Sequence, residues 1–255
     1  MKNRIFITLF MLLAVVMISF LALPLLGLFQ HVGIVKLGQA FLDKEVLRSI
    51  LLTLGLSLAG VILVGLAGVP LAYLLARYNF RGKSVVEAII DIPVMVPHTA
   101  AGIALLLAFS QPAVQHMLDA LGLSFMDSPL GIMAAMSFLS APLLINGAKE
   151  GFRKTDSRYE KAARTLGASH AGAFFSVVLP LARKDVVNGG LMMWSRGLGE
   201  FGAVVIIAYH PMVAPVLIYD RFNSFGLAYS APVAAAMIAL SILIFLAVRA
   251  FNNRR

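Results

Sequence analysis

The sequence predicts an all-α, polytopic membrane protein with six transmembrane helices. Of its 255 residues, 60% are hydrophobic and 13% are charged, whereas a typical soluble domain has about 45–50% apolar and about 25% charged residues. A soluble fold of this composition would expose large apolar patches to water. Six segments are apolar and long enough to cross a bilayer as a helix of about 20 residues, and basic residues gather in alternate connections between them.

The six predicted spans belong to one transmembrane domain, residues 1–255, and cover about 5–29, 49–76, 85–109, 129–148, 186–208 and 230–251. The first span follows Lys2 and Arg4, as the apolar part of a secretory signal would. Its apolar run is much longer than the roughly 7–15 residues of a signal peptide, so we expect it to be retained as a helix. The even number of spans places both termini on one side of the membrane.

The distribution of basic residues predicts that this side is the cytoplasm. Most of the 21 Lys and Arg residues lie at the two termini or in the connections after the second and fourth spans, and cytoplasmic loops carry such an excess. The formal net charge of +9 therefore reports membrane topology, and we expect no nucleic-acid partner. The predicted location is the cytoplasmic membrane, with the lipid bilayer as the surrounding partner.

The second span carries small residues at helical spacing, which are Gly55, Ala59, Gly68, Ala72 and Ala76. Small residues let helices approach closely in lipid, where apolar burial alone supplies little driving force. Tight packing within one subunit is one interpretation, and a seam between two subunits is the other.

The third span begins with a proline-containing segment, residues 91–99. Its prolines, Pro93 and Pro97, remove amide donors and bend the helix, which membrane helices tolerate when neighbours or water satisfy the freed carbonyls. Because such a break often lines a cavity, Pro97, His98 and Thr99 are candidate residues of a translocation pathway. A purely structural kink is the alternative.

The connection after the fourth span, residues 149–185, is the most basic part of the chain and contains a short predicted helix. Ser157 and Glu160 have the spacing of a capping box, in which the hydroxyl accepts from a backbone amide and the carboxylate reaches back. Gly167 suits the left-handed conformation that ends a helix. A helix of fewer than three turns is not stable alone in water, so the membrane domain or a partner must hold it.

The apolar face of this short helix is narrow and consists of Tyr159, Ala163 and Leu166, which share one side of a helix. An amphipathic helix on the lipid headgroups is one interpretation, because Lys and Arg favour anionic lipid. A narrow, Ala-containing face buries little area in lipid, however, and suits a cleft in a protein. This favours contact with a partner.

The fifth span contains Ser195, Arg196 and Glu200. Charges at membrane depth cost at least about 2.5 kcal/mol each on insertion scales, and such residues usually pair or face water. Arg196 and Glu200 are four residues apart on one helical face, so an ion pair within the helix is sterically available. A self-neutralised pair that supports the helix bundle is one interpretation, and a gate or pathway that includes Ser195 is the other.

The loop after the fourth span resembles the coupling signature of ABC-importer permeases. In that signature a Gly is followed by nine residues, an aliphatic residue, one further residue and then Leu-Pro, and Gly167, Val177 and Leu179-Pro180 fit this spacing. The usual Glu position is Lys161 here, and the acid lies one residue earlier, which rotates it by about 100° around the helix. The resemblance implies contact with an ATPase for Tyr159, Glu160, Ala162, Ala163, Arg164, Leu166, Gly167, Leu179 and Pro180.

The chain also resembles the molybdate/tungstate ABC permeases over about residues 68–240. This resemblance is carried by segments 91–93, 97–99, 102–105, 149–152, 196–203 and 214–219. Sulfate permeases share the third-span pattern and the pairing of Arg196 with Glu200. The resemblance therefore implies a permease for molybdate or tungstate, with sulfate, thiosulfate or another small anion as the alternative.

The same resemblance implies the architecture and the partners. It implies a type I ABC importer permease fold and a homodimer of six-helix subunits around a central pathway. Two cytoplasmic ATPases would receive the coupling helices, and an extracytoplasmic oxyanion-binding protein would dock on the outer loops. ATP and Mg would be bound by the ATPase, because this chain has no G-x-x-x-x-G-K-[ST] phosphate loop.

Other function classes find little support in the sequence. The absence of cysteine excludes disulfides, thiolate metal sites and cysteine nucleophiles, and the five histidines are scattered, so we expect no metal site and no cofactor bound by this chain. A membrane-embedded enzyme would need a convergent set of catalytic polar groups, and none is evident. A channel or secondary transporter remains the alternative from a different class, but it would not need the Gly167–Pro180 motif.

Overall fold

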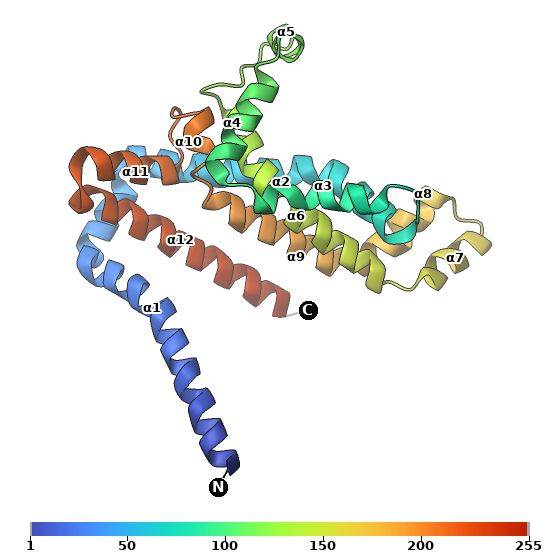
Figure 1. Cartoon of the computed structure of the whole chain (residues 1–255), viewed down its shortest axis with the longest axis horizontal. Helices are drawn as coiled ribbons and strands as arrows, with labels where there is room; N and C mark the ends of the chain where they lie inside the picture. The colour runs from blue at the N-terminus through green and yellow to red at the C-terminus, as the bar shows by residue number, and fades with distance from the viewer. Residues whose placement is uncertain (1, 254–255) are drawn as a thin grey trace. The chain divides into compact units, whose positions relative to one another are not determined.

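The computed structural model describes residues 2–253, with side chains described for residues 4–246, and every regular element in this range is a helix (Figure 1). The chain forms two compact units. One joins the part up to Ile50 to the part from Leu217, and the other is Leu51–Val216. Among the basic residues that predict topology, the side chains of Lys2 and Arg249 and all of Arg254 and Arg255 lie outside the described residues.

The first unit contains α1 (Lys2–Leu42), the start of α2 (Lys44–Arg77), most of α11 (Ala214–Phe225) and α12 (Leu227–Asn253). Non-helical angles at Gly33 (φ 67°, ψ 163°) put a kink into α1, a conformation that glycine adopts without a Cβ penalty. Val32 packs there against Ala231 and Ala235 of α12. Arg221 of α11 forms ion pairs with Asp43 at 2.8 Å and Glu45 at 2.7 Å, which fasten α11 to the start of α2.

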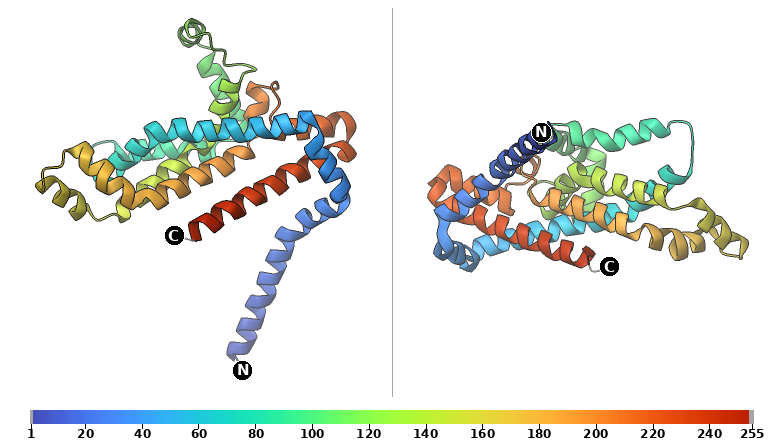
Figure 2. Two further views of the ribbon diagram at one scale, coloured as in Figure 1. Left: turned by 180° about the vertical axis from the view of Figure 1, so that it is seen from behind. Right: turned by 90° about the horizontal axis from the view of Figure 1, so that it is seen from below.

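The second unit contains the rest of α2 and the elements up to the start of α11. In chain order these are α3 (Lys83–Met95), α4 (His98–Phe109), α5 (Pro112–Ala120), α6 (Pro129–Lys154), α7 (Ser157–Thr165), α8 (His170–Ala173), the π-helix η1 (Phe174–Val178), α9 (Leu179–Leu198) and α10 (Val204–Ile207). Helices α6 and α9 run side by side (Figure 2). A Cβ at Gly147 would lie 2.9 Å from the Cα of Gly189, so glycines permit this close crossing.

Packing within the subunit accounts for part of the small-residue pattern in α2. A Cβ at Gly68 would lie 3.0 Å from Ile145 of α6, and Ala72 is fully buried. The intrasubunit interpretation is therefore confirmed for these two positions. Gly55 has no atom within 4 Å of an added Cβ, so it does not take part in that seam.

Four helices of the described residues are long and apolar enough to cross a membrane, which are Arg4–Leu42, Lys44–Arg77, Pro129–Lys154 and Leu227–Leu246. Helices α3 and α4 form a fifth candidate as a pair bent by 118°. The predicted bend is confirmed: α3 ends at Met95, and Val96 before Pro97 is extended, as the residue before a proline prefers.

The predicted fifth span is not one helix. Helix α9 ends at Leu198 and α10 begins at Val204, so the segment from Gly199 to Ala203 interrupts residues 186–208. Gly197, Gly199 and Gly202 favour this interruption, because glycine is among the poorest helix formers. The protein is a multi-pass membrane protein, and the count of six spans stays a prediction, as does the single domain over residues 1–255.

Candidate functional site along α9

The predicted coupling helix exists as α7, but its N-cap differs from the prediction. The N-cap is Asp156, whose carboxylate accepts from the amide of Arg158 at 2.9 Å. The predicted capping box between Ser157 and Glu160 is therefore wrong. Asp156 supplies the capping oxygen one residue earlier, and the Glu160 side chain is engaged elsewhere.

The C-terminal end of α7 agrees with the prediction. Gly167 has φ +95°, the left-handed conformation that glycine adopts most readily. The Gly167 amide donates to the Arg164 carbonyl and the Ala168 amide to the Ala163 carbonyl, both at 3.0 Å. These two bonds form a Schellman motif, so the helix stops here for a local reason.

The side chains of α7 are largely open. No residue of the helix is buried, Tyr159 is 60% exposed and Leu166 beyond its end is 89% exposed. Ala163 is half-buried against the chain itself, whereas Ala162 and Arg164 are exposed. Helix α7 projects beyond the ends of α6 and α9 (Figure 1). The predicted face is thus available to a partner at Tyr159 and Leu166.

Glu160 faces its own subunit. Its Oε1 accepts from the hydroxyl of Tyr73, and its Oε2 lies 3.3 Å from Nε of Arg77. Nη1 of Arg77 donates to the carbonyl of Thr155 at 2.9 Å. The side chains of Arg77 and Glu160 are each 12% exposed. Sequence reasoning missed Tyr73 and Arg77. The available signal was their spacing of four residues at the end of a span, which places both side chains on one face of the helix.

An aromatic cluster packs against Tyr73 and so supports its contact with Glu160. The Tyr73 ring meets Phe152 edge to face at 5.7 Å and Phe174 at 4.9 Å, and Phe152 is completely buried. Phe174 begins the π-helix η1, in which the Leu179 amide donates to the Phe174 carbonyl. Pro180, next in the chain, has no amide and crowds the preceding turn, which accounts for the wider π turn.

The Leu-Pro of the coupling signature therefore lies where η1 passes into α9. Leu179 is half-buried and packs against the buried cluster that includes Phe152 and Val178, whereas Pro180 is exposed. The structure thus places the signature partly on the free surface of α7 and partly in the core behind it.

The other end of α9 carries a second charged cluster. Nη1 of Arg196 donates to Oε2 of Glu200 at 3.1 Å, and Nη2 lies 2.7 Å from Nε2 of His98. Nδ1 of His98 is 3.3 Å from the same Glu200 oxygen. Oε1 of Glu200 accepts from the Ala203 amide at 3.1 Å. The predicted Arg196–Glu200 pair is confirmed, and Glu200 also stabilises the segment that leads into α10.

Exposure is divided unequally within this cluster. The Glu200 side chain is 1% exposed, whereas those of Arg196 and His98 are 34% and 45% exposed. Pro97, Thr99 and Ser195 are also exposed, and the Ser195 hydroxyl donates to the Met192 carbonyl at 3.1 Å. A buried carboxylate thus holds a cation and an imidazole whose outer parts remain accessible.

The two helix breaks pack directly on each other. A Cβ at Gly102 would lie 2.9 Å from the Cα of Ala203, and a Cβ at Gly202 would lie 2.8 Å from Cβ of His98. This close approach brings His98 to Arg196 although 98 residues separate them. Of the candidate pathway residues predicted from two different spans, His98, Arg196 and Glu200 are therefore in contact, whereas the Ser195 hydroxyl bonds to Met192 instead.

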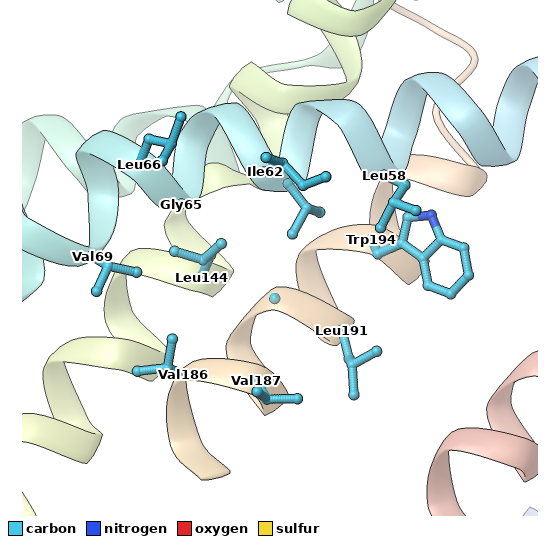
Figure 3. A pocket seen from close by; sticks show the side chains of 12 residues that line it. Leu58, Ile62, Gly65, Leu66, Val69, Leu144, Val186, Val187, Leu191 and Trp194 are labelled. Carbon is cyan, nitrogen blue, oxygen red and sulfur yellow. The ribbon is translucent and has the colours of Figure 1, made fainter. Parts of the chain in front are cut away.

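An apolar hollow of about 360 Å³ lies between α2, α6 and α9 (Figure 3). Its lining is apolar and includes Leu58, Ile62, Leu66, Leu144, Val187, Leu191 and Trp194. The Trp194 indole donates to the Leu54 carbonyl at 3.3 Å, so its one polar atom is used within the helix packing. This hollow has no group suited to an oxyanion.

Within the described residues, no group of three or more His, Cys, Asp or Glu side chains is arranged to hold a metal ion. The charged clusters at the two ends of α9 each contain an Arg and a Glu and are suited to ion pairing.

Comparison with known proteins agrees with this architecture. The family whose model matches residues 68–255 is described as binding-protein-dependent transport system inner membrane component. The molybdate/tungstate transport system permease protein WtpB of Pyrococcus abyssi is 42% identical, over 91% of this chain and 90% of the relative. The sulfate transport system permease protein CysT of Synechococcus elongatus is 30% identical, over 91% and 87%.

Solved structures show the same fold. A bacterial ABC transporter involved in the import of the acidic polysaccharide alginate has a TM-score of 0.75 at 18% identity, over 99% of this chain and 96% of that chain. A bacterial alginate ABC transporter in complex with an alginate pentasaccharide-bound periplasmic protein has a TM-score of 0.69 at 20% identity, over 95% and 93%. The predicted ABC-importer permease fold is confirmed.

Proposed function

The chain belongs to the family of binding-protein-dependent transport system inner membrane components, and from this premise we propose that it forms the pathway through which an ATP-driven importer carries molybdate or tungstate. As an ABC permease subunit it is the non-catalytic membrane component of its transporter. The substrate proposal rests on one observation, the 42% identity to a molybdate/tungstate permease along nearly the whole chain.

The proposed ATPase contact is the free surface of α7. Tyr159, Ala162, Arg164 and Leu166 are exposed on a helix that projects from its unit, and a helix of this length needs a partner to cover such a surface. ATP and Mg would be bound by that ATPase. Both termini and α7 would lie in the cytoplasm, where the positive-inside rule places the basic residues around α7.

The proposed assembly is a homodimer that docks an extracytoplasmic oxyanion-binding protein. The likeness to an alginate transporter in complex with its periplasmic protein supports the presence of a binding protein. Two copies would supply two α7 helices to an ATPase pair, and the pathway would run between the copies.

The proposed pathway passes the second charged cluster. Arg196 offers an accessible guanidinium, His98 an imidazole and Thr99 a hydroxyl beside it in sequence. Glu200 fixes Arg196 and offsets its charge, which suits a pathway that must release what it admits. The alternative role, a pair that only stabilises the two helix breaks, rests on the hydrogen bond from Ala203 to Glu200.

Sulfate, thiosulfate or another small anion remains the second candidate substrate, favoured by the 30% identity to a sulfate permease. The test is ATP-dependent uptake by proteoliposomes that contain this chain, its ATPase and its binding protein, with labelled molybdate, tungstate and sulfate in competition. We expect molybdate and tungstate to be taken up and to compete with each other. Sulfate uptake that excess molybdate and tungstate leave unchanged would overturn the substrate proposal. Uptake of a sugar would overturn the whole oxyanion proposal.

A further inference from the structure

Helix α7 is attached to its unit by very few contacts. Its nine residues contain no buried side chain, and short connections join it to α6 and α8. A force on the exposed surface of so short a helix would rotate it about these connections unless a further contact fixed its position. The question is therefore which contact makes α7 move together with the membrane helices.

The contacts of Glu160 answer this question. Oε1 of Glu160 accepts a hydrogen bond from the Tyr73 hydroxyl, and Oε2 forms an ion pair with the Arg77 guanidinium. Arg77 also donates to the carbonyl of Thr155, in the connection that enters α7. Because the Arg77 and Glu160 side chains are only 12% exposed, water and salt screen this pair less than an ordinary surface pair.

The receiving side of these contacts is closely packed. Tyr73 and Arg77 lie near the C-terminal end of α2, and the Tyr73 ring packs on Phe152 of α6 and Phe174 of η1. The same core includes Val178 and continues into α9. A displacement of Glu160 is therefore imposed on α2, α6 and α9 together.

We propose that Tyr73 and Arg77 are positioning residues that lock the coupling helix to α2 through Glu160. The inference rests on the proposed function of α7 as the ATPase contact. It assigns Glu160, the only acid of α7, to a contact within the permease. The free surface of α7 then carries the exposed cations Arg158, Lys161 and Arg164 as well. Without the lock, α7 still binds the ATPase, but its movement is not transmitted.

The test uses the full chain assembled with its ATPase subunit and binding protein, in nanodiscs for ATP hydrolysis and in proteoliposomes for uptake. Arg77→Gln and Glu160→Gln each break the ion pair and leave the exposed face of α7 unchanged. We expect both variants to co-purify with the ATPase and to lose uptake per ATP hydrolysed by roughly 5- to 150-fold, the usual range of coupling between sites. The double variant should be less impaired than the product of the two single losses, because both changes remove the same Arg77–Glu160 ion pair.

Two conservative variants and one control separate transmission from folding. Arg77→Lys keeps the charge and should retain most of the coupling, and Tyr73→Phe should cause a smaller loss because only its hydroxyl is removed. Lys154→Gln is the matched control. It breaks a 2.8 Å ion pair to Asp185 that joins α6 to α9 without touching α7, and it should leave uptake per ATP unchanged.

The absence of cysteine in the chain allows a direct rescue. In the Arg77→Cys, Glu160→Cys variant, a flexible thiol-specific cross-linker added after assembly should restore uptake per ATP, and a reductant that cleaves it should remove the gain. A pair needed only for folding would not respond to such a late cross-link.

Several results would overturn the lock. Normal uptake per ATP in both Gln variants is one such result, and losses that multiply in the double variant are another. A third is release of the ATPase by Glu160→Gln, which would place the carboxylate on the free surface of α7. If the Gln variants do not assemble, full coupling in Tyr73→Phe together with no effect of the cross-link would reject it. Failure of the unsubstituted chain to bind any ATPase would instead reject the proposed function itself.

Discussion

The two ends of α9 carry clusters of the same charges in opposite arrangements. Near α7, Arg77 and Glu160 are both 12% exposed, so the pair is enclosed on both sides. At the helix breaks, Glu200 is 1% exposed whereas Arg196 is 34% exposed. The stretch of α9 from Leu179 to Arg196 is about 25 Å long at 1.5 Å per residue. The enclosed pair is suited to holding two elements together, and the half-open one is suited to meeting an anion.

The difference shows why an Arg–Glu pair cannot be assigned a role from its residue types alone. Glu160 uses both oxygens to connect α7 to α2. Oε1 of Glu200 accepts from the backbone amide of Ala203, three residues further along the chain. Its Oε2 contacts Arg196 and His98. In the first cluster the acid carries the connection between elements. In the second it fixes the position of a cation.

Topology is the prediction with the largest expected effect, because its outcome is all or none. If α7 reaches a cytoplasmic ATPase, reporter fusions at Gly82 and Thr155 should report the cytoplasm, and fusions at Asp119 and Pro215 the outside. The physical reason is the excess of basic residues around the first two positions. Activity at Thr155 of a reporter that functions only outside the cytoplasm would place α7 on the outer side of the membrane. The enclosed Arg77–Glu160 pair could then not lie beside an ATPase contact.

The coupling end should be the more sensitive to backbone and charge changes. Gly167→Val places a β-branched residue at φ +95°, and Ala163→Asp introduces a charge on a half-buried position. We expect both variants to reach the membrane and to lose uptake by at least about tenfold, within the usual range of coupling. The measurements are membrane content by immunoblot and ATP-dependent uptake by vesicles.

Gly82→Val is the matched control for this prediction. Gly82 also has a positive φ, +87°, but it lies in the connection between α2 and α3. Uptake by this variant should stay close to that of the unsubstituted chain. Normal uptake by Gly167→Val and Ala163→Asp would return α7 to the interpretation of a helix on the lipid surface.

The break end should depend on the buried carboxylate of Glu200. Glu200→Leu leaves Arg196 and the buried amide of Ala203 without their acceptor, and a buried donor left unsatisfied costs about 1–3 kcal/mol. Glu200→Gln keeps an oxygen for the Ala203 amide, so it should be less destabilised. We expect the melting temperature of the purified protein to fall in the order Glu200→Gln, then Glu200→Leu. Equal melting temperatures for these two variants would contradict a role of Glu200 at the helix break.

The double variant Arg196→Met, Glu200→Leu then separates the two interpretations of this cluster. A pair that only neutralises itself should permit nearly normal uptake in the double variant, because neither charge is stranded. A variant that assembles but transports poorly would favour contact between Arg196 and the passing anion.

Sequence reasoning was reliable where the cause of a structure is local. The Schellman motif at Gly167 follows from one glycine, and the bend after Met95 follows from Pro97 acting on the residue before it. The N-cap was misplaced by one residue because Asp156 and Ser157 both supply a capping oxygen, and only the entering backbone decides between them. The existence of the helix and its end did not depend on this choice.

The contacts that define both clusters were beyond sequence reasoning. Tyr73 is 87 residues from Glu160, and His98 is 98 residues from Arg196. Such pairs form only when the helices have packed, and no periodicity within one span reports them. The interruption after Leu198 had a local signal in its glycines, but the apolar character of residues 186–208 outweighed it and predicted one continuous span.

The third Arg cluster, in the other compact unit, is more open and provides the smallest expected effect. Arg221 is 18% exposed, Asp43 36% and Glu45 62%. Burial raises the pKa of Asp43. The hydrogen bond from Arg221 and those from the backbone amides of Glu45 and Val46 outweigh this effect, so the pKa is lowered. A lowered pKa stabilises the folded state above the ordinary Asp value of about 3.9, and this contribution is lost as the pH falls through the folded-state pKa.

Arg221→Gln should therefore lower the stability only slightly at neutral pH, by about 0.2–1 kcal/mol, as is usual for exposed pairs. The difference in melting temperature between this variant and the unsubstituted chain should persist from pH 7 down to about pH 4 and then shrink, because Asp43 becomes protonated in both proteins. Lys154→Gln breaks an exposed pair in the other unit and serves as the control for general effects of acid. A difference that grows on acidification would mean that Asp43 does not depend on Arg221, and that enclosure of an Arg–acid pair is a poor guide to its strength in this protein.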